Sequence, residues 1–179
     1  MKVHTLLDLH GNIPSFIRIT AGKTSDVNIL DEFLPEAGAF YVFDRGYIDF
    51  ARLFVFTLCS AFFVVRTKEN VLLQRRYSHP VDKSTGVRSD HTVILTTIES
   101  TKAYPDPLRR VSYLDVENRR RLKFLTILFS AHDEKCRAKC EHKQACEIDV
   151  TALQHKCYAQ HLCCNVKFQK CGVDTPRAP

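Results

Sequence analysis

Asp44 is the residue whose type and position point most directly to chemistry. It follows the almost wholly apolar residues 39–43 and precedes Arg45, Gly46 and Tyr47. A carboxylate at the mouth of a buried strand is poorly placed for packing and well placed to hold a divalent cation. The local pattern also allows Asp44 to cap a helix that follows it. We expect its carboxylate in a shallow depression near Asp8 or Arg66.

Basic side chains are the second group that could carry chemistry, because a basic surface attracts the phosphates of nucleic acid. The chain has a net charge of +6, and its excess of lysine and arginine lies in the middle of the sequence. Arg45 and Lys68 follow strand ends near Asp44 and are the best placed to face a substrate. Solvated turns or strand edges are the alternative for the arginine runs Arg75, Arg76, Arg109, Arg110, Arg119, Arg120 and Arg121.

The elements that would position Asp44 form an α/β pattern. A strand, a helix and a further strand in sequence predict a mixed or parallel sheet with buried strands. Ser25 or Asp26 can cap a helix that runs to Leu34. The expected elements are a hairpin over residues 3–8 and 15–20, buried strands at 39–43 and 61–66, and a helix at 49–60.

From residue 71 onward the pattern changes to strand-like pieces separated by turns. Four such pieces predict an antiparallel, β-rich region that carries most of the excess positive charge. They span residues 71–77, 92–98, 110–114 and 121–128.

The last part of the chain differs in composition, because Cys59 is the only cysteine before residue 130 and seven more follow it. The irregular cysteine spacing and sparse apolar residues favour a divergent, poorly ordered tail, such as a frame shift or a fusion would produce. A zinc site is the alternative. Its ligands would be Cys136, Cys140, His142 and Cys146, or Cys157, His161, Cys163 and Cys164.

Neither a membrane span nor an export signal is visible in the sequence. No run approaches the roughly 18 apolar residues that a spanning helix needs, and the first residues lack an apolar stretch. We therefore expect no membrane partner, no disulfide framework and a cytoplasmic location.

Several motifs together resemble the insertion-sequence-four family of DDE transposases. The resemblance extends over roughly residues 2–129, with the motifs in the order and spacing of that family. The motifs are Lys2-Val3-His4-Thr5-Leu6-Leu7-Asp8, Gly11-Asn12-Ile13-Pro14, Gly22-Lys23-Thr24-Ser25-Asp26-Val27, Phe40-Tyr41-Val42-Phe43-Asp44-Arg45-Gly46-Tyr47 and Pro80-Val81-Asp82-Lys83-Ser84-Thr85-Gly86.

The resemblance implies a ribonuclease-H-like catalytic core with a β-rich insertion. It implies a partial core at residues 1–70, an insertion at 71–129 and a divergent tail at 130–179. In this family three carboxylates, Asp, Asp and Glu, hold two Mg²⁺ ions that activate water or a 3′ hydroxyl for attack on a phosphodiester. Asp44 matches the second carboxylate of the three.

The other two carboxylates are not found in the sequence. The first Asp of the family lies on a central strand before the hairpin, and this sequence starts at Met1 just before the hairpin. The third is a Glu in the pattern Tyr-x2-Arg-x3-Glu-x6-Lys, and alignment from Tyr158 puts His161, Asn165 and Gly172 in the places of Arg, Glu and Lys. We therefore expect a fragment that is inactive by itself.

Three hypotheses about function follow. The first is a fragment of a transposase whose parent activity is Mg²⁺-dependent cleavage and strand transfer of transposon-end DNA. The second is a non-catalytic DNA-binding or interaction remnant that contacts a full-length transposase subunit, with or without a zinc-binding tail. The third is a degenerate reading frame. Without the central strand, we expect residues 3–8 either to pair directly with residues 40–43 or to leave a gap.

Overall fold

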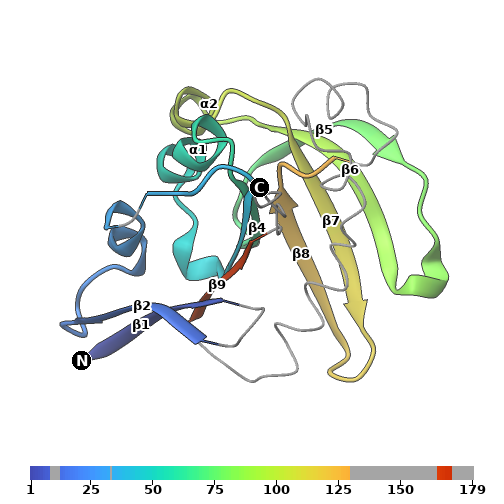
Figure 1. The fold of residues 1–179 in the computed structure, drawn as a ribbon. Helices are drawn as coiled ribbons and strands as arrows, with labels where there is room; N and C mark the ends of the chain where they lie inside the picture. The colour runs from blue at the N-terminus through green and yellow to red at the C-terminus, as the bar shows by residue number, and fades with distance from the viewer. Residues whose placement is uncertain (9–12, 33, 130–164, 171–179) are drawn as a thin grey trace, which may run out of the picture.

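The computed structural model describes residues 1–8, 13–32, 34–129 and 165–170, which form a mixed α/β domain rich in β-sheet (Figure 1). Its strands belong to a nine-stranded sheet in the order β2-β1-β9-β3-β4-β8-β7-β6-β5. No helix in the described part of the chain is long and apolar enough to cross a membrane.

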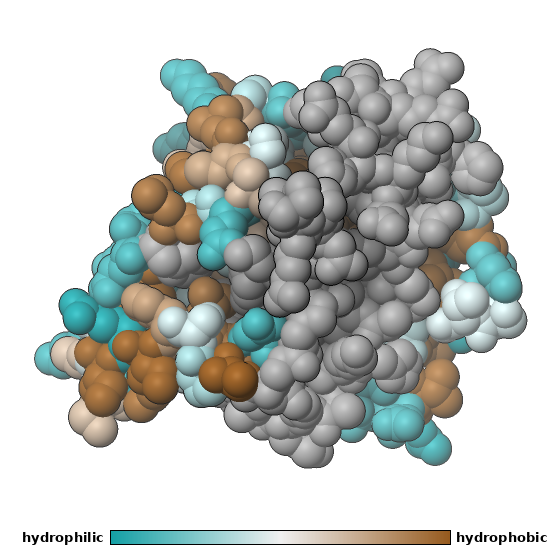
Figure 2. Space-filling model, viewed as in Figure 1, coloured by the Kyte–Doolittle hydropathy of each residue, from teal (hydrophilic) through white to brown (hydrophobic). Residues whose placement is uncertain are grey.

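The N-terminal hairpin pairs β1 (Lys2–Asp8) with β2 (Ile13–Thr20) in antiparallel register, as the sequence predicts. His4 and Leu6 of β1 are buried, whereas Val3, Ile17 and Ile19 on the opposite side of the hairpin are exposed. Figure 2 shows brown, apolar residues gathered over the β1–β2 hairpin, to which the exposed Val3, Ile17 and Ile19 belong.

The segment after the hairpin departs from the predicted helix. Residues Asp26–Asp31 form the 3-10 helix η1, and Ser25 makes no side-chain capping hydrogen bond. Ile29 and Leu30 are buried, but Leu34 is 85% exposed. The apolar side that a longer α-helix would need is therefore not buried, and the regular helix ends before Leu34.

The strand β3 (Ala39–Phe43) lies in the interior of the sheet, and every one of its residues is buried. It pairs in parallel with β4 (Phe62–Arg66), and the helix α1 (Phe50–Leu58) connects the two strands. Asp49 caps α1, because its side chain accepts a hydrogen bond from the backbone N–H of Arg52 at 3.0 Å. This strand, helix and strand agree with the sequence prediction.

The following elements form an antiparallel series that joins the same sheet, because β8 (Arg120–Thr126) pairs with β4. The remaining strands of this series are β5 (Leu73–His79), β6 (Val87–Leu95) and β7 (Leu108–Asp115). The strand expected at residues 92–98 instead ends at Leu95. Thr97 caps the short helix α2 (Ile98–Ala103) by accepting a hydrogen bond from the Ser100 N–H.

Two hydrophobic clusters cover opposite faces of the sheet, because neighbouring residues of a strand point to opposite sides. The larger cluster includes Tyr41, Phe43, Phe56, Phe63 and Tyr104, and it lies on the side of α1 and α2. The smaller cluster consists of Phe40, Val42, Val64, Leu122, Phe124 and Leu128.

The strand β9 (Asn165–Lys170) lies between the hairpin and β3. It runs parallel to β1 and antiparallel to β3. The expectation that residues 3–8 would either meet residues 40–43 or leave a gap is therefore wrong, because a third strand supplies the backbone hydrogen-bonding groups that both neighbours need. Residues 130–164 and 171–179, with all the candidate zinc ligands, lie outside the described residues.

Candidate functional site

Asp44 lies immediately after β3, at the carboxyl ends of the parallel strands β3 and β4, as the sequence predicts. It occupies the N-cap position directly before the 3-10 turn η2 (Arg45–Tyr47), yet its side chain makes no capping hydrogen bond. The next helix is capped by Asp49 instead. The capping interpretation of Asp44 is therefore wrong, and its carboxylate, 44% exposed, is directed to other partners.

A backbone hydrogen bond and close packing fix the turn that follows Asp44. The Tyr47 N–H donates to the Asp44 carbonyl at 3.0 Å, and the Tyr47 side chain is buried. A Cβ atom at Gly46 would lie 3.0 Å from Oδ2 of Asp26, so glycine lets the turn approach η1 closely. The Asp44 position is thus fixed by packing as well as by the strand that precedes it.

A buried hydrogen-bond network links this turn to the hairpin. His4 is 2% exposed, and its Nδ1 lies 3.0 Å from the hydroxyl of Tyr47 while its Nε2 lies 3.0 Å from Oγ1 of Thr20. Both ring nitrogens therefore have partners. The sequence gave no sign that His4 contacts the Asp44 turn.

Arg66 is the nearest charged partner of Asp44. Phe43 and Val65 are paired in the register of β3 and β4, so the residues that follow them lie side by side. Nη2 of Arg66 lies 2.9 Å from Oδ1 of Asp44. Arg66, one of the two expected neighbours, is therefore beside Asp44. Asp8, the other, lies two strands away, because β9 separates β1 from β3, and it is level with Tyr41.

An open cleft adjoins Asp44, and it brings together three of the residues predicted from sequence: Asp44, Arg45 and Lys68. Its remaining lining residues are Asp26, Gly46, Thr67, Glu69 and Asn70. The Asp26 carboxylate is engaged by Nζ of Lys2 at 2.9 Å. The cleft therefore combines carboxylates with basic side chains, as a site for a phosphate and a cation would require.

The donor set of the cleft fits a single, weakly held Mg²⁺ ion. Carboxylate oxygens are hard ligands of the kind Mg²⁺ prefers, and this ion commonly binds one or two carboxylates and completes its shell with water and substrate phosphates. Within the described ranges, no group of three or more His, Cys, Asp or Glu side chains is arranged around a common point. Asp44 is the half-exposed carboxylate that could serve as the protein ligand.

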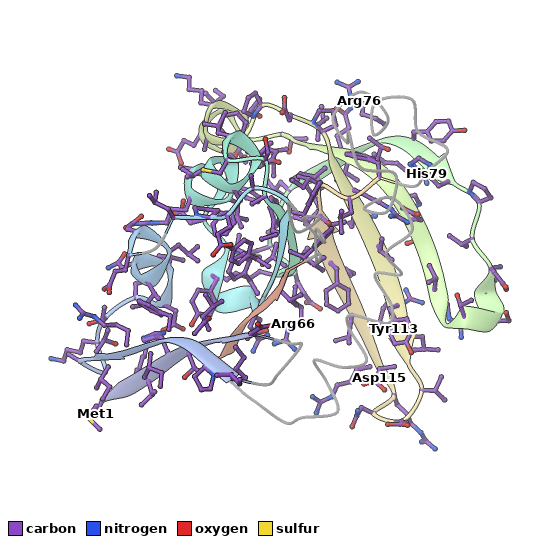
Figure 3. All side chains as sticks on the ribbon, viewed as in Figure 1. Met1, Arg66, Arg76, His79, Tyr113 and Asp115 are labelled. Carbon is purple, nitrogen blue, oxygen red and sulfur yellow. The ribbon has the colours of Figure 1, made fainter. Side chains whose placement is uncertain are left out.

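The arginines 119–121 lie at the tip of the β7–β8 hairpin. β8 runs antiparallel to β4, and Arg66 is paired with Phe124. The residues before Phe124 therefore extend beyond the carboxyl end of β4, which is the end of the sheet where Asp44 lies. Arg120 is four residues before Phe124, which places it roughly 13 Å beyond the level of Arg66 at the usual rise of a strand. In Figure 3, Asp115 marks this tip and Arg66 lies between the tip and the N-terminal hairpin.

Arg75 and Arg76 are placed differently. They belong to β5, the outermost strand at the other end of the sheet order from the N-terminal hairpin, and Figure 3 shows Arg76 and His79 well away from Arg66. Both arginines are exposed on this strand, as is Tyr77. The structure therefore does not bring Arg75 and Arg76 to the Asp44 cleft.

Arg109, which the sequence offered as a phosphate contact, has a structural role instead. Its guanidinium binds the buried Asp90, with Nη2 at 2.6 Å from Oδ2, and also donates to the carbonyl of Leu128 at 3.1 Å. Arg110 donates to Nδ1 of His91 at 3.2 Å. Arg109 is therefore not a solvated strand-edge residue, the alternative that the sequence left open, and it has few donors left for DNA.

Arg66 is a site residue for which the sequence indicated no role beyond that of a possible neighbour of Asp44. Its signal was present: Arg66 is the last residue of the buried strand β4, Asp44 directly follows β3, and parallel strands end at the same edge. What the sequence could not supply was the register that places the two residues next to each other.

Comparisons with known proteins identify the family of the chain. Residues 1–132 match the family described as transposase DDE domain. The chain is 34% identical over 116 residues to "Putative transposase y4zB" from Sinorhizobium fredii (strain NBRC 101917 / NGR234). This alignment covers 63% of the chain and 32% of the relative, so the chain spans about a third of that protein's length. No solved structure matches the chain.

Proposed function

The chain belongs to the DDE transposases, and from that premise we propose that it supplies one metal-binding carboxylate, Asp44, together with a basic surface that contacts DNA. Members of this family act on DNA with the help of a divalent metal ion. The observation that carries the proposal is the half-exposed Asp44 carboxylate at the carboxyl end of a fully buried strand, without a capping role.

We propose a ribonuclease-H-like arrangement for the first part of the sheet, with residues 1–70 as a partial core and 71–129 as the β-rich insertion. The strand order supports it: a hairpin on one side, β3 and β4 on the other, and a strand between them. In this arrangement β9 takes the central place that another strand has in the family.

Asp44 would hold the metal ion, and Arg45, Lys68 and the arginines 119–121 would hold DNA phosphates. A bound Mg²⁺ ion would supply Lewis-acid stabilisation and a more acidic water molecule. The residues of the chain would orient the DNA, because Arg45 and Lys68 line the same cleft as Asp44 and neutralise phosphate charge there. The substrate of the whole protein would be transposon-end DNA, and its partner a full-length transposase subunit.

By itself the chain should not complete the reaction. One carboxylate cannot clamp the attacking and leaving oxygens together, and the described residues place no second and third ligand beside Asp44. We expect the purified chain neither to nick nor to join DNA in Mg²⁺ or Mn²⁺, measured with supercoiled plasmid. Strand transfer that depends on metal and disappears in Asp44→Ala would contradict this expectation.

DNA binding can be tested directly by fluorescence anisotropy with a labelled duplex at several salt concentrations. Binding should weaken steeply with salt and depend little on sequence. The double substitution Arg119→Ala and Arg120→Ala should reduce the slope of log K against log salt by roughly 0.9 for each DNA phosphate that the variant no longer neutralises.

The matched control removes two lysines away from the cleft, Lys83 in the turn between β5 and β6 and Lys102 on α2. Replacing both lysines by alanine changes the net charge as much as the double arginine substitution does, and it should change the salt slope less. Equal effects of the two double substitutions would indicate that the chain responds to total charge only, and that the β7–β8 tip is not a DNA contact.

A further inference from the structure

The Asp44–Arg66 pair is fixed by the register of two parallel strands. Val42 lies two residues before Asp44, and Val64 lies two residues before Arg66. Both valines belong to the smaller hydrophobic cluster. The side chains of Asp44 and Arg66 therefore leave the sheet on the same face and next to each other. No reorganisation of the backbone is needed to bring them together.

The contact between the two side chains is incomplete. An arginine can bind a carboxylate through two parallel hydrogen bonds, but the ion pair here joins Nη2 of Arg66 to Oδ1 of Asp44. Nε of Arg66 is buried and has no hydrogen-bond partner among the described residues. The guanidinium therefore leaves one donor unsatisfied while it neutralises the carboxylate.

The pair is also accessible to solvent, with exposed side-chain fractions of 26% for Arg66 and 44% for Asp44. Ion pairs of this kind contribute little stability, because solvent screens them. A cation from solution can therefore compete for the same carboxylate oxygen. A guanidinium and a metal ion cannot both lie against Oδ1, since their positive charges repel.

We propose that Arg66 is a built-in counter-ion of Asp44, which a divalent cation must displace in order to bind there. This inference rests on the proposed function, because it takes Asp44 as the cation ligand. Arg66 is thus a positioning residue: it keeps the Asp44 carboxylate neutralised and oriented in the metal-free protein, and it lowers the apparent affinity of Asp44 for a divalent cation.

The test measures Mn²⁺ binding to the full chain without DNA, by the loss of the free Mn²⁺ signal in electron paramagnetic resonance. Arg66→Gln removes the competing charge and should bind Mn²⁺ about twofold to fivefold more tightly, the ratio that matches the usual strength of a partly exposed ion pair. Lys68→Gln, in the same cleft, is the control for loss of charge alone and should produce a smaller gain.

The gain must depend on Asp44. The double substitution Arg66→Gln and Asp44→Asn should therefore show no gain over Asp44→Asn. Arg66→Lys, which keeps the charge without the planar guanidinium, provides a second variant if Arg66→Gln fails to fold, and it should lie between the wild type and Arg66→Gln.

Four outcomes would overturn the inference. They are equal or weaker Mn²⁺ binding by Arg66→Gln, equal gains in Arg66→Gln and Lys68→Gln, a gain that survives Asp44→Asn, and no Mn²⁺ binding by any variant up to millimolar concentration. The assay contains no DNA, so failure of DNA binding in the anisotropy experiment would count against the proposed function and leave this result standing.

Discussion

Two of the aspartate–arginine pairs among the described residues unite the same chemical groups in different surroundings. Asp44–Arg66 lies at the carboxyl ends of β3 and β4, with one short contact and side chains partly exposed to solvent. Asp90–Arg109 lies between β6 and β7, where Nε and Nη2 of Arg109 both contact the Asp90 carboxylate, and the Asp90 side chain is 8% exposed.

The difference shows how burial decides what an ion pair can do. The Asp90–Arg109 pair is enclosed and satisfied, and Arg109 also donates to the Leu128 carbonyl, so removing one partner would leave a buried charge without compensation. The Asp44–Arg66 pair can exchange partners at small cost, because water and ions reach it. We infer that the first pair maintains the fold and that the second is available for function.

The largest expected effect follows from breaking the enclosed pair. Asp90→Ala should lower the free energy of unfolding by roughly 3 to 5 kcal/mol, because Arg109 would keep its charge in a partly buried position without a partner. The measurement is urea denaturation of the full chain followed by circular dichroism. Arg109→Ala should act in the same direction.

The matched substitution at the exposed pair is Asp44→Ala, which should change the free energy of unfolding by less than about 1 kcal/mol. If Asp44→Ala destabilised the chain as much as Asp90→Ala, the two pairs would not differ in kind. Asp44 would then be a structural residue, and the distinction drawn from burial would fail.

An intermediate effect is expected at the buried neutral contact behind Asp44. Tyr47→Phe removes the hydroxyl that meets Nδ1 of His4 and leaves that nitrogen buried without its partner, which should cost about 1 to 3 kcal/mol of unfolding free energy. Tyr77→Phe, on the exposed strand β5, is the control and should lie within about 0.5 kcal/mol of the wild type. Equal effects of the two substitutions would show that the His4 contact contributes no stability.

The smallest effect concerns pH. Burial lowers the pKa of His91, and the nearby charges of Arg110 and Arg75 lower it further, while Asp90 acts in the opposite direction. The Arg110 guanidinium can only donate, so Nδ1 of His91 accepts and the ring is neutral in this arrangement.

Because the folded pKa of His91 is depressed, the unfolded chain binds the proton more readily. This contribution to stability is present above the unfolded pKa of about 6.5 and decreases as pH falls from there toward the folded pKa. Unfolding measured between pH 7.5 and pH 5 should show a component that His91→Gln removes. An identical pH dependence in His91→Gln would mean that other groups account for it, and proton NMR of the His91 ring would then show an ordinary titration.

The elements that depend on local pattern were predictable from sequence. The apolar residues of β3, the Asp49-capped helix α1 and the hairpin all have signals within a few residues, and each was found close to its predicted bounds. The 3-10 helix η1 and the short helix α2 were not predicted correctly, because elements of six residues carry too little periodicity to distinguish helix types.

The site was predictable only as a list of residues. The sequence placed Asp44, Arg45 and Lys68 at strand ends, and the structure brings these three to one cleft. It could not separate Arg109 from the other arginines, because its partner Asp90 lies on a neighbouring strand and register is a tertiary property. The pairing of β9 between β1 and β3 was equally invisible, since strand neighbours far apart in sequence leave no local signal.

The central claim is that Asp44 is a cation ligand, and iron-directed cleavage of the chain tests it most directly. Fe²⁺ bound in place of Mg²⁺ produces hydroxyl radicals that cut the backbone near the ion, in the presence of ascorbate and peroxide. We predict cuts within residues 44–46 and 67–70, which line the cleft together with Asp26, and we predict the loss of these cuts in Asp44→Asn. Absence of cuts at these segments, or the same cuts in Asp44→Asn, would contradict it.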